Sequence, residues 1–182
     1  MTMHAALLRA INLAGKNQVA MADLRALFER LGFPQARTLL QSGNVVFESA
    51  GKTTAKLEKL LEEAAGGGLG VRTDFFVRSA PEWNEILARN PFPVEAREDP
   101  GRLIVLLLKE APEAADVKAV QKAIRGPEVI RSYGRQAYIT YPDGMGRSRL
   151  TPAVLEKGLG TRGTARNWNT ALRIAAALST SV

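Results

Sequence analysis

The chain has 182 residues, of which 46% are hydrophobic, enough to bury the core of one sizeable domain or of two small ones. It contains no cysteine and one histidine, which excludes disulfides, thiolate chemistry and zinc sites built from sulfur or from several imidazoles. The net charge is +7, and the whole excess of positive charge lies in residues 101–182, which contain thirteen basic and six acidic residues.

The first eighty residues predict the order strand, helix, strand, strand, helix, strand. Apolar runs and β-branched residues indicate the strands, and apolar residues at helical spacing indicate the helices. This order is the split βαβ pattern of a ferredoxin-like unit. In chain order, the predicted elements are a strand at Ala5–Ile11, a helix from Met21 that ends at Gly32, strands at Arg37–Leu40 and Val45–Glu48, a helix at Thr53–Ala65 and a strand at Val71–Val77.

A short helix is predicted at Pro81–Ala88, and the sequence Asn-Pro-Phe-Pro that begins at Asn90 cannot continue it. Proline lacks the backbone donor and restricts the residue before it. We therefore expect residues 90–101 to link two subdomains.

The second half predicts strand, helix, strand, strand, helix, an echo of the first half without a residue-level repeat. The unbroken apolar run Leu103–Leu108 is typical of a strand covered on both faces. The fold class expected is α+β, with ferredoxin-like subdomains at residues 1–80 and 102–182, joined by residues 81–101 and followed by C-terminal helices. In this half the predicted elements are strands at Leu103–Leu108, Val129–Arg131 and Gln136–Tyr141, and helices at Glu113–Ile124, from Thr151 to Gly158 or Gly160, and from about Ala165 to Leu178.

The start of the last predicted helix reads T-A-R-N-W-N-T, from Thr164 to Thr170. Thr164 is expected as N-cap, with Trp168 facing the core and Arg166 and Asn169 facing outward. Free amides at a helix start attract anions, so Arg166, Asn167 and Asn169 are candidate ligand contacts. Local capping by the two asparagines is the alternative.

Two further polar motifs lie in the first half. Arg9 lies inside the apolar run of the first predicted strand. An unpaired guanidinium is costly to bury there, so its side chain must reach the strand end, an acidic partner or a ligand. Asn12, Lys16 and Asn17 follow in a loop whose Gly-Lys pair weakly resembles phosphate-holding loops, with ordinary solvated loop residues as the alternative.

The second of these motifs is Gln41-Ser42-Gly43-Asn44, which is a candidate ligand contact or simply a hairpin turn. In the second half, the Gly-rich basic run 144–149 could form an anion nest from backbone amides, or it could be a flexible surface loop.

No nucleophile elbow, zinc-binding helix or dinucleotide fingerprint is present, so the sequence names no reaction, metal or cofactor. The longest apolar run is far shorter than the ~20 residues of a membrane span. The first residues lack the pattern of a signal peptide, so we expect a cytoplasmic protein without a membrane partner.

With these motifs in this order, the chain resembles a bacterial family, domain of unknown function 1697 (DUF1697). The resemblance covers nearly the whole chain and rests on Arg9–Asn17, Gln41–Phe47 and Thr164–Thr170. It implies an α+β protein with two ferredoxin-like subdomains, and it carries no activity with it.

Three hypotheses for function follow. The first is a cleft that binds a small ligand bearing phosphate or carboxylate groups. The second is nucleic-acid binding by the basic second half, with Tyr133, Tyr138 and Tyr141 beside Arg131 and Arg135. The third is that the motifs are structural and form buried amide networks. The ligand-binding residues expected under the first hypothesis are Arg9, Asn12, Lys16, Asn17, Gln41, Ser42, Asn44, Arg166, Asn167 and Asn169.

Overall fold

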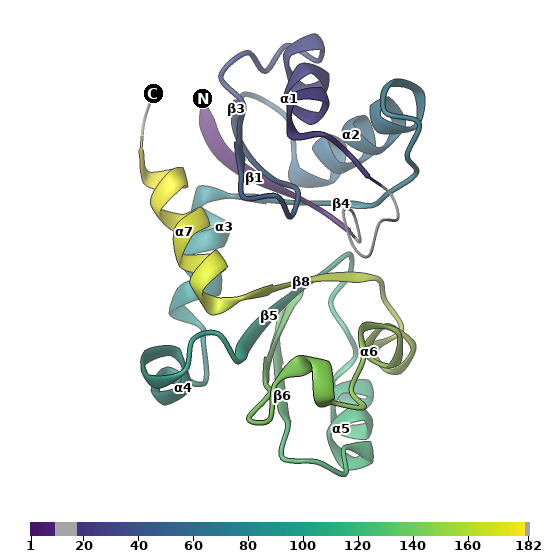
Figure 1. Cartoon of the computed structure of the whole chain (residues 1–182), viewed down its shortest axis with the longest axis vertical. Helices are drawn as coiled ribbons and strands as arrows, with labels where there is room; N and C mark the ends of the chain where they lie inside the picture. The colour runs from purple at the N-terminus through teal and green to yellow at the C-terminus, as the bar shows by residue number, and fades with distance from the viewer. Residues whose placement is uncertain (10–17, 181–182) are drawn as a thin grey trace. The chain divides into compact units, whose positions relative to one another are not determined.

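The computed structural model describes residues 1–9 and 18–180. The chain divides into two compact units, the first formed by residues 1–84 and 174–182 and the second by residues 85–173. Each unit contains one four-stranded antiparallel sheet (Figure 1). The protein is therefore of the mixed α+β class, as the sequence predicts.

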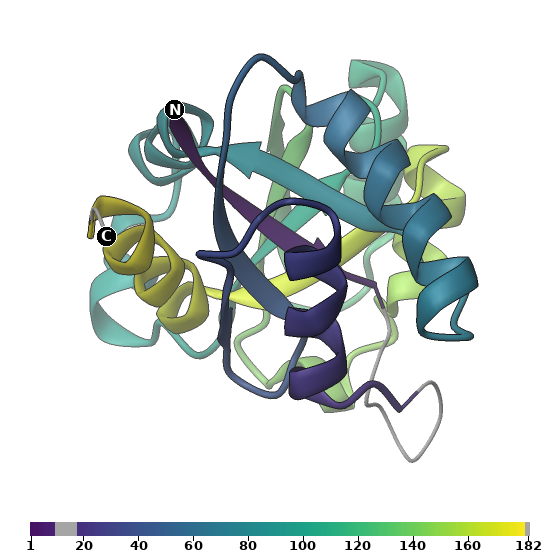
Figure 2. The same ribbon diagram turned by 90° about the horizontal axis from the view of Figure 1, so that it is seen from above.

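The first unit is built on the sheet order β2-β3-β1-β4, with every neighbouring pair antiparallel. Two helices, α1 and α2, lie on the same face of this sheet (Figures 1 and 2). Thr53 caps the second of them by accepting the Lys56 N–H at 3.3 Å. The elements are β1 Thr2–Leu8, α1 Met21–Arg30, β2 Arg37–Leu39, β3 Asn44–Ser49, α2 Thr54–Gly68, β4 Phe75–Ser79 and α3 Ala80–Ala88.

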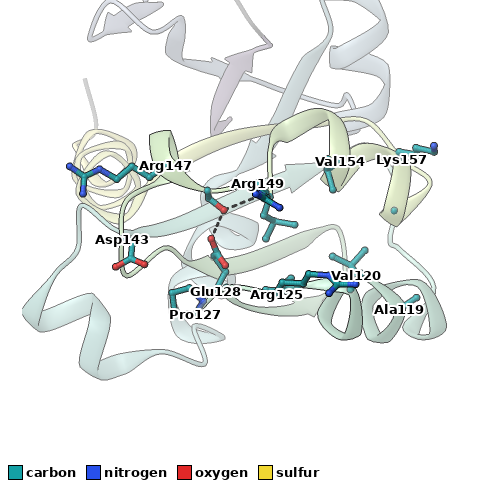
Figure 3. A pocket seen from close by; sticks show the side chains of 16 residues that line it. Ala119, Val120, Arg125, Pro127, Glu128, Asp143, Arg147, Arg149, Val154 and Lys157 are labelled. Atoms are coloured by element: carbon teal, nitrogen blue, oxygen red, sulfur yellow. Dashed lines mark hydrogen bonds between the residues drawn. The ribbon is translucent and has the colours of Figure 1, made fainter.

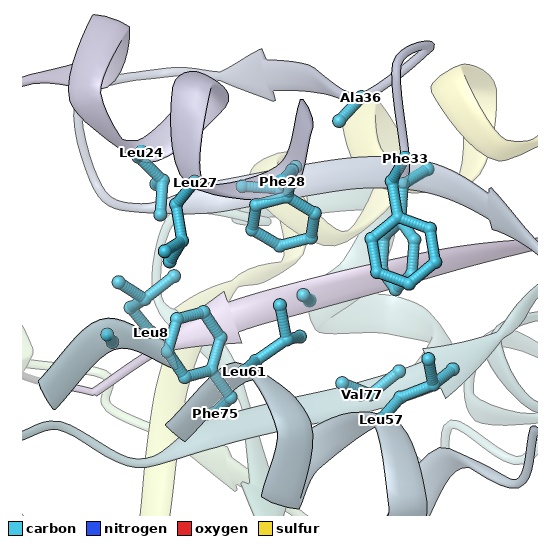
Figure 4. Packing of buried hydrophobic residues seen from close by; sticks show 14 of the residues in the cluster. Leu8, Leu24, Leu27, Phe28, Phe33, Ala36, Leu57, Leu61, Phe75 and Val77 are labelled. Carbon is cyan, nitrogen blue, oxygen red and sulfur yellow. The ribbon is translucent and has the colours of Figure 1, made fainter. Parts of the chain in front are cut away.

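Aromatic rings fill the space between this sheet and its helices (Figure 4). Phe28 of α1 lies 5.1 Å from Phe47 of β3 and 6.5 Å from Phe75 of β4, measured between ring centroids. Leu57 and Leu61 of α2 belong to the same core. Alternate strand residues thus face the helices, as the period of two requires.

The outer edge of β4 is covered by carboxylates from α2. The Phe75 N–H donates to Glu62 Oε1 and the Val77 N–H donates to Glu58 Oε1, both at 2.9 Å. The two acceptors are four residues apart on one helix face, and the two donors are two residues apart on one strand edge. Glu58 also lies 3.4 Å from Nη1 of the buried Arg78.

The second unit repeats this plan with the sheet order β6-β7-β5-β8, again with antiparallel neighbours. Helices α5 and α6 lie on one face of the sheet (Figure 1). Gln121 of α5 accepts the Ile130 N–H at 2.8 Å, and Glu156 of α6 accepts the Gly163 N–H at 3.0 Å. The elements are α4 Pro93–Glu98, β5 Leu103–Leu108, α5 Ala114–Ala123, β6 Val129–Tyr133, β7 Gln136–Thr140, the 3-10 turn η1 Met145–Arg147, α6 Pro152–Leu159, β8 Gly163–Asn167 and α7 Trp168–Ser179.

The two units also agree in register. Leu8 of β1 pairs with Phe75, and Leu108 of β5 pairs with Gly163. In the same way Arg78 pairs with Ala5, and Arg166 pairs with Val105. The echo seen in the element order therefore extends to individual strand positions.

The observed units divide the chain differently from the expected subdomains. The divisions fall within α3 and within α7, and not in residues 90–101. That segment is ordered within the second unit, where it contains α4. Asn90 accepts the Phe92 N–H at 3.0 Å, and the Pro100 carbonyl accepts the Trp168 N–H at 3.1 Å.

The expected helix from Ala165 is wrong in its first turn, because residues 163–167 form strand β8. Backbone pairing with the central strand β5, from Gly163–Leu108 to Asn167–Ile104, outweighs the helical preference of this segment. Thr164 is consequently a strand residue and not an N-cap.

We predict that Glu58→Ala lowers the free energy of unfolding by about 3 kcal/mol, because it removes a buried acceptor from Val77 and a buried charge partner from Arg78. Urea denaturation followed by circular dichroism measures the change. Glu63→Ala on the exposed side of the same helix is the control and should cost less than about 0.5 kcal/mol. Equal losses in the two variants would contradict the assigned role of Glu58.

Candidate functional site

The first polar motif begins at the end of β1. The Arg9 N–H donates to the Asp74 carbonyl at 3.0 Å, and its guanidinium lies 3.7 Å from Asp74 Oδ2. Thr73 donates its hydroxyl to the Arg9 carbonyl at 2.7 Å. Arg9 thus has the strand end and the acidic partner that its position requires. The other candidates of this motif, Asn12, Lys16 and Asn17, lie outside the described residues.

The motif Gln41–Asn44 forms the turn between β2 and β3. Asn44 is buried and donates its side-chain amide to the Leu39 carbonyl at 3.1 Å and to Ser42 Oγ at 2.9 Å. Gln41 and Ser42 are exposed. The Asn44 side chain therefore holds the turn, which agrees with the hairpin alternative.

A backbone hydrogen bond joins the turn to the end of β1. The Leu8 N–H donates to the Gly43 carbonyl at 2.9 Å, which places the turn beside Arg9. Two of the three motifs therefore lie side by side in the first unit. The third motif belongs to the second unit, and a shared pocket for all three stays a prediction.

The third motif crosses from β8 into α7. Asn167 Oδ1 accepts the Thr170 N–H at 2.9 Å and caps this helix, so local capping is the observed role of Asn167. Trp168 is buried, as predicted, and Asn169 is exposed.

Arg166 does not face outward as the helical projection predicts. Because it lies in a strand, its side chain folds back along that strand, and Nη1 donates to Thr164 Oγ1 at 2.9 Å and to the Ala165 carbonyl at 2.8 Å. Burial lowers the pKa of Arg166 to about 10.

A groove of about 1110 Å³ lies wholly within the second unit, between α5 with the segment after it and α6 with the loop before it (Figure 3). Its size is at the upper end of the range for small-molecule pockets. The lining residues fall into an apolar group and a charged group. The apolar group comprises Ala119, Val120, Ala123, Ile124, Pro127, Leu150 and Val154, and the charged group comprises Arg125, Glu128, Asp143, Arg147, Arg149 and Lys157.

The groove carries four exposed cationic side chains against two carboxylates. Within residues 18–180, none of these four cations has an ion pair or a side-chain hydrogen bond. Glu128 is buried, and its carboxylate accepts the Ser148 hydroxyl (Figure 3). Ser148 Oγ in turn accepts the Leu150 N–H at 3.0 Å. One carboxylate is thus engaged by the loop, and the groove keeps a net positive charge.

The two helices that form the walls touch at one glycine. A Cβ at Gly158 would lie 2.5 Å from Cγ2 of Val120, so any larger residue would push α6 away from α5. In the segment after α5, a Cβ at Gly126 would lie 2.3 Å from Glu128 Oε2. Glycine at these two positions therefore permits the close approach of α6 to α5 and of the Glu128 carboxylate to its own loop.

None of the groove residues is among the expected ligand contacts. The only sequence signal was the basic run 144–149, which contributes Arg147, Ser148 and Arg149 to the groove. Part of that run forms η1. The groove residues on α5 and α6 give no sequence signal of a binding site, because apolar residues at helical spacing predict only a buried helix face.

Comparisons with known proteins agree with the motifs. The family described as "Protein of unknown function (DUF1697)" matches residues 1–138. The chain belongs to the DUF1697 family. It is also similar to a solved structure described as conserved bacterial protein SP0830 from Streptococcus pneumoniae, at 25% identity and a TM-score of 0.76, over 98% of this chain and 99% of that one. No curated protein matches the sequence.

The part of this DUF1697 protein that the structure describes has no helix with the length and hydropathy of a membrane span. Among the same residues, no three His, Asp or Glu side chains gather as metal ligands would.

The tyrosines of this family member do not form an aromatic surface. Tyr138 and Tyr141 are buried, and they donate their hydroxyls to the carbonyls of Ile86 at 2.7 Å and Leu150 at 2.9 Å. Tyr133 is exposed, with the guanidinium of Arg89 over its ring at 4.3 Å. The expectation that all three stack on bases is therefore wrong for the two buried rings, which pack in the protein interior.

We predict that Asn44→Ala lowers the free energy of unfolding by about 1–3 kcal/mol, because the partly buried Leu39 carbonyl and the turn lose their amide donor. The exposed neighbour Gln41→Ala is the control, with an expected loss below about 0.5 kcal/mol. Chemical denaturation of both variants measures the difference. Similar losses in both would show that Asn44 does not hold the turn.

Tyrosine burial predicts a dependence of stability on alkaline pH. Burial raises the pKa of Tyr138 to about 12, above the ordinary value of about 10. The unfolded chain loses this proton first, so the stabilisation is complete below about pH 10 and disappears as pH rises toward about 12. Wild type should therefore lose more unfolding free energy over this range than Tyr138→Phe, measured by urea denaturation at several pH values. Parallel curves would contradict the prediction.

Proposed function

We propose that the protein binds a small anionic ligand, bearing phosphate or carboxylate groups, in the groove between α5 and α6. The observation that carries the proposal is a group of four cations that have no ion pair or side-chain hydrogen bond among residues 1–9 and 18–180. They surround one recessed, largely apolar groove: Arg125, Arg147, Arg149 and Lys157.

Charge and geometry both support an anion as ligand. Three of the four cations are arginines, whose planar fork suits bidentate contacts with phosphate or carboxylate. A recessed site also raises the local field, because its walls exclude part of the solvent. The uneven net charge of the chain agrees with this, since the groove lies in the basic second half.

The polar motifs are not the main ligand contacts in this proposal. The Asn44 and Asn167 side chains bond to nearby main chain, which favours the structural reading for these two residues. Ligand contacts by Arg9, Gln41 and Ser42 remain a secondary proposal, supported by the exposure of the turn and its position beside Arg9.

We also infer that each unit is a ferredoxin-like subdomain. The orders β2-β3-β1-β4 and β6-β7-β5-β8, with two helices on one face, support this assignment. A cytoplasmic location is part of the same proposal and is supported by the absence of cysteine.

A thermal-shift panel of inorganic phosphate, nucleotides, sugar phosphates and organic acids tests the proposal, and calorimetry measures the Kd of any ligand that raises the Tm. We predict that the double variant Arg125→Glu and Arg149→Glu raises this Kd at least about tenfold, since each charged hydrogen bond contributes about 1.5–3 kcal/mol.

Lys122→Glu is the matched control, because Lys122 is an exposed cation on α5 that does not line the groove. It should leave the Kd within about twofold of wild type. A panel in which no anion raises the Tm, or equal effects of the two variants, would overturn the proposal. Salt-dependent retention of single-stranded oligonucleotides, with no small-ligand binding, would replace it with nucleic-acid binding.

A further inference from the structure

The groove has two chemically different ends. Figure 3 shows Ala119, Val120 and Val154 at one end, with Lys157 at the rim, and Asp143 and Arg147 at the other. Arg125, Glu128 and Arg149 lie between these ends. A purely polar anion would contact only the charged part and would leave the wall between α5 and α6 uncovered.

The apolar end combines exposed side chains from two helices. Val154 of α6 is 49% exposed, yet it lines the same recess as Val120 and Ala119 of α5. Ala119 and Ala123 of α5 and Val154 of α6 are exposed beside the buried Val120, so both helices contribute to one apolar wall of the recess. Such a wall inside a recess marks a binding site for an apolar group.

We infer that the ligand is a soluble single-chain amphiphile, with a carboxylate or phosphate head group near Arg125 and Arg149 and an aliphatic chain along the wall of α5 and α6. This inference rests on the proposed function, because it names the ligand class of the same groove.

The shape of the groove favours a single chain over a larger partner. At Gly158 the helices α5 and α6 are in contact, so nothing passes between them and a ligand must lie along the wall. The volume of about 1110 Å³ exceeds what a simple inorganic anion occupies and suits a ligand with a long flexible part.

Calorimetry with alkyl phosphates and alkanoates from two to twelve carbons, below their micellar concentrations, tests the inference. We expect the Kd to fall about three- to fourfold for each added methylene until the wall is covered. Uncharged alkyl alcohols of the same lengths should bind at least tenfold more weakly than the anions, because a neutral hydroxyl forms no hydrogen bond between two ionised groups with the arginines.

The variant Val154→Ser isolates the apolar contact. It should raise the Kd of decyl phosphate about threefold or more and leave that of inorganic phosphate unchanged. Val94→Ser is the matched control, because Val94 is also 49% exposed but lies on α4 outside the groove. A circular dichroism spectrum and the Tm of each variant establish that it is folded.

The outcomes separate the inference from the proposed function. If short anions bind as tightly as long ones, and Arg125→Glu with Arg149→Glu weakens both, the anion site stands and the amphiphile inference fails. Binding to vesicles of anionic phospholipid but not to monomeric amphiphiles would also overturn it. If no anion of any length binds, the proposed function itself fails.

Discussion

The free edges of two small sheets impose the constraint on which the rest of the structure depends. An open sheet leaves N–H groups of its outer strands without partners, and each such group costs about 1–3 kcal/mol when buried. Helix side chains supply the missing acceptors here: Glu58 and Glu62 for β4, Gln121 for β6 and Glu156 for β8. These bonds are directional, so they fix the position of each helix along its strand, which apolar packing alone specifies less strictly. They also make these edges poor templates for pairing with another chain.

The same constraint accounts for the groove. Gln121 ties α5 to β6 at one edge of the second sheet, while Glu156 ties α6 to β8 at the opposite edge. The helices are held from opposite sides and meet where Gly158 lies against Val120. The space beyond this contact is bordered by the segment after α5 and by the loop before α6, and Glu128 and Ser148 join these two segments. The recess is therefore a consequence of how the helices are anchored and not of a flexible surface loop.

Local patterns predicted most elements, because apolar periodicity, prolines and glycines act within a few residues. Leu103–Leu108 has the predicted bounds, and most other helices and strands differ from prediction by one to four residues at their ends. The failure at Thr164–Asn167 has a nonlocal cause, since the backbone partner of β8 lies some sixty residues earlier in the chain. Polar residues near turns predict ligand contacts, but side-chain amides near turns also bond to nearby main chain, as those of Asn44 and Asn167 do. The groove could not be predicted, because three separate segments build it and only one of them is conspicuously basic.

The two units differ in the side chains that fill their cores. Four phenylalanines occupy the core beneath α1 and α2, with ring centroids 4.9–6.5 Å apart in the contacting pairs: Phe28, Phe33, Phe47 and Phe75. By strand register, Ile139 stands where the first unit has Phe47, and Gly163 stands where it has Phe75. Leucines of β5 take up the space above Gly163, since a Cβ there would lie 2.8 Å from Leu106 Cδ1. A pocket at the α1 and α2 side of the first unit measures about 160 Å³, against about 1110 Å³ for the groove. The same sheet order thus occurs once over a core with four phenylalanines and once over a core that is aliphatic except for Tyr141, beside a basic groove. On the proposed function, ligand binding belongs to the second unit.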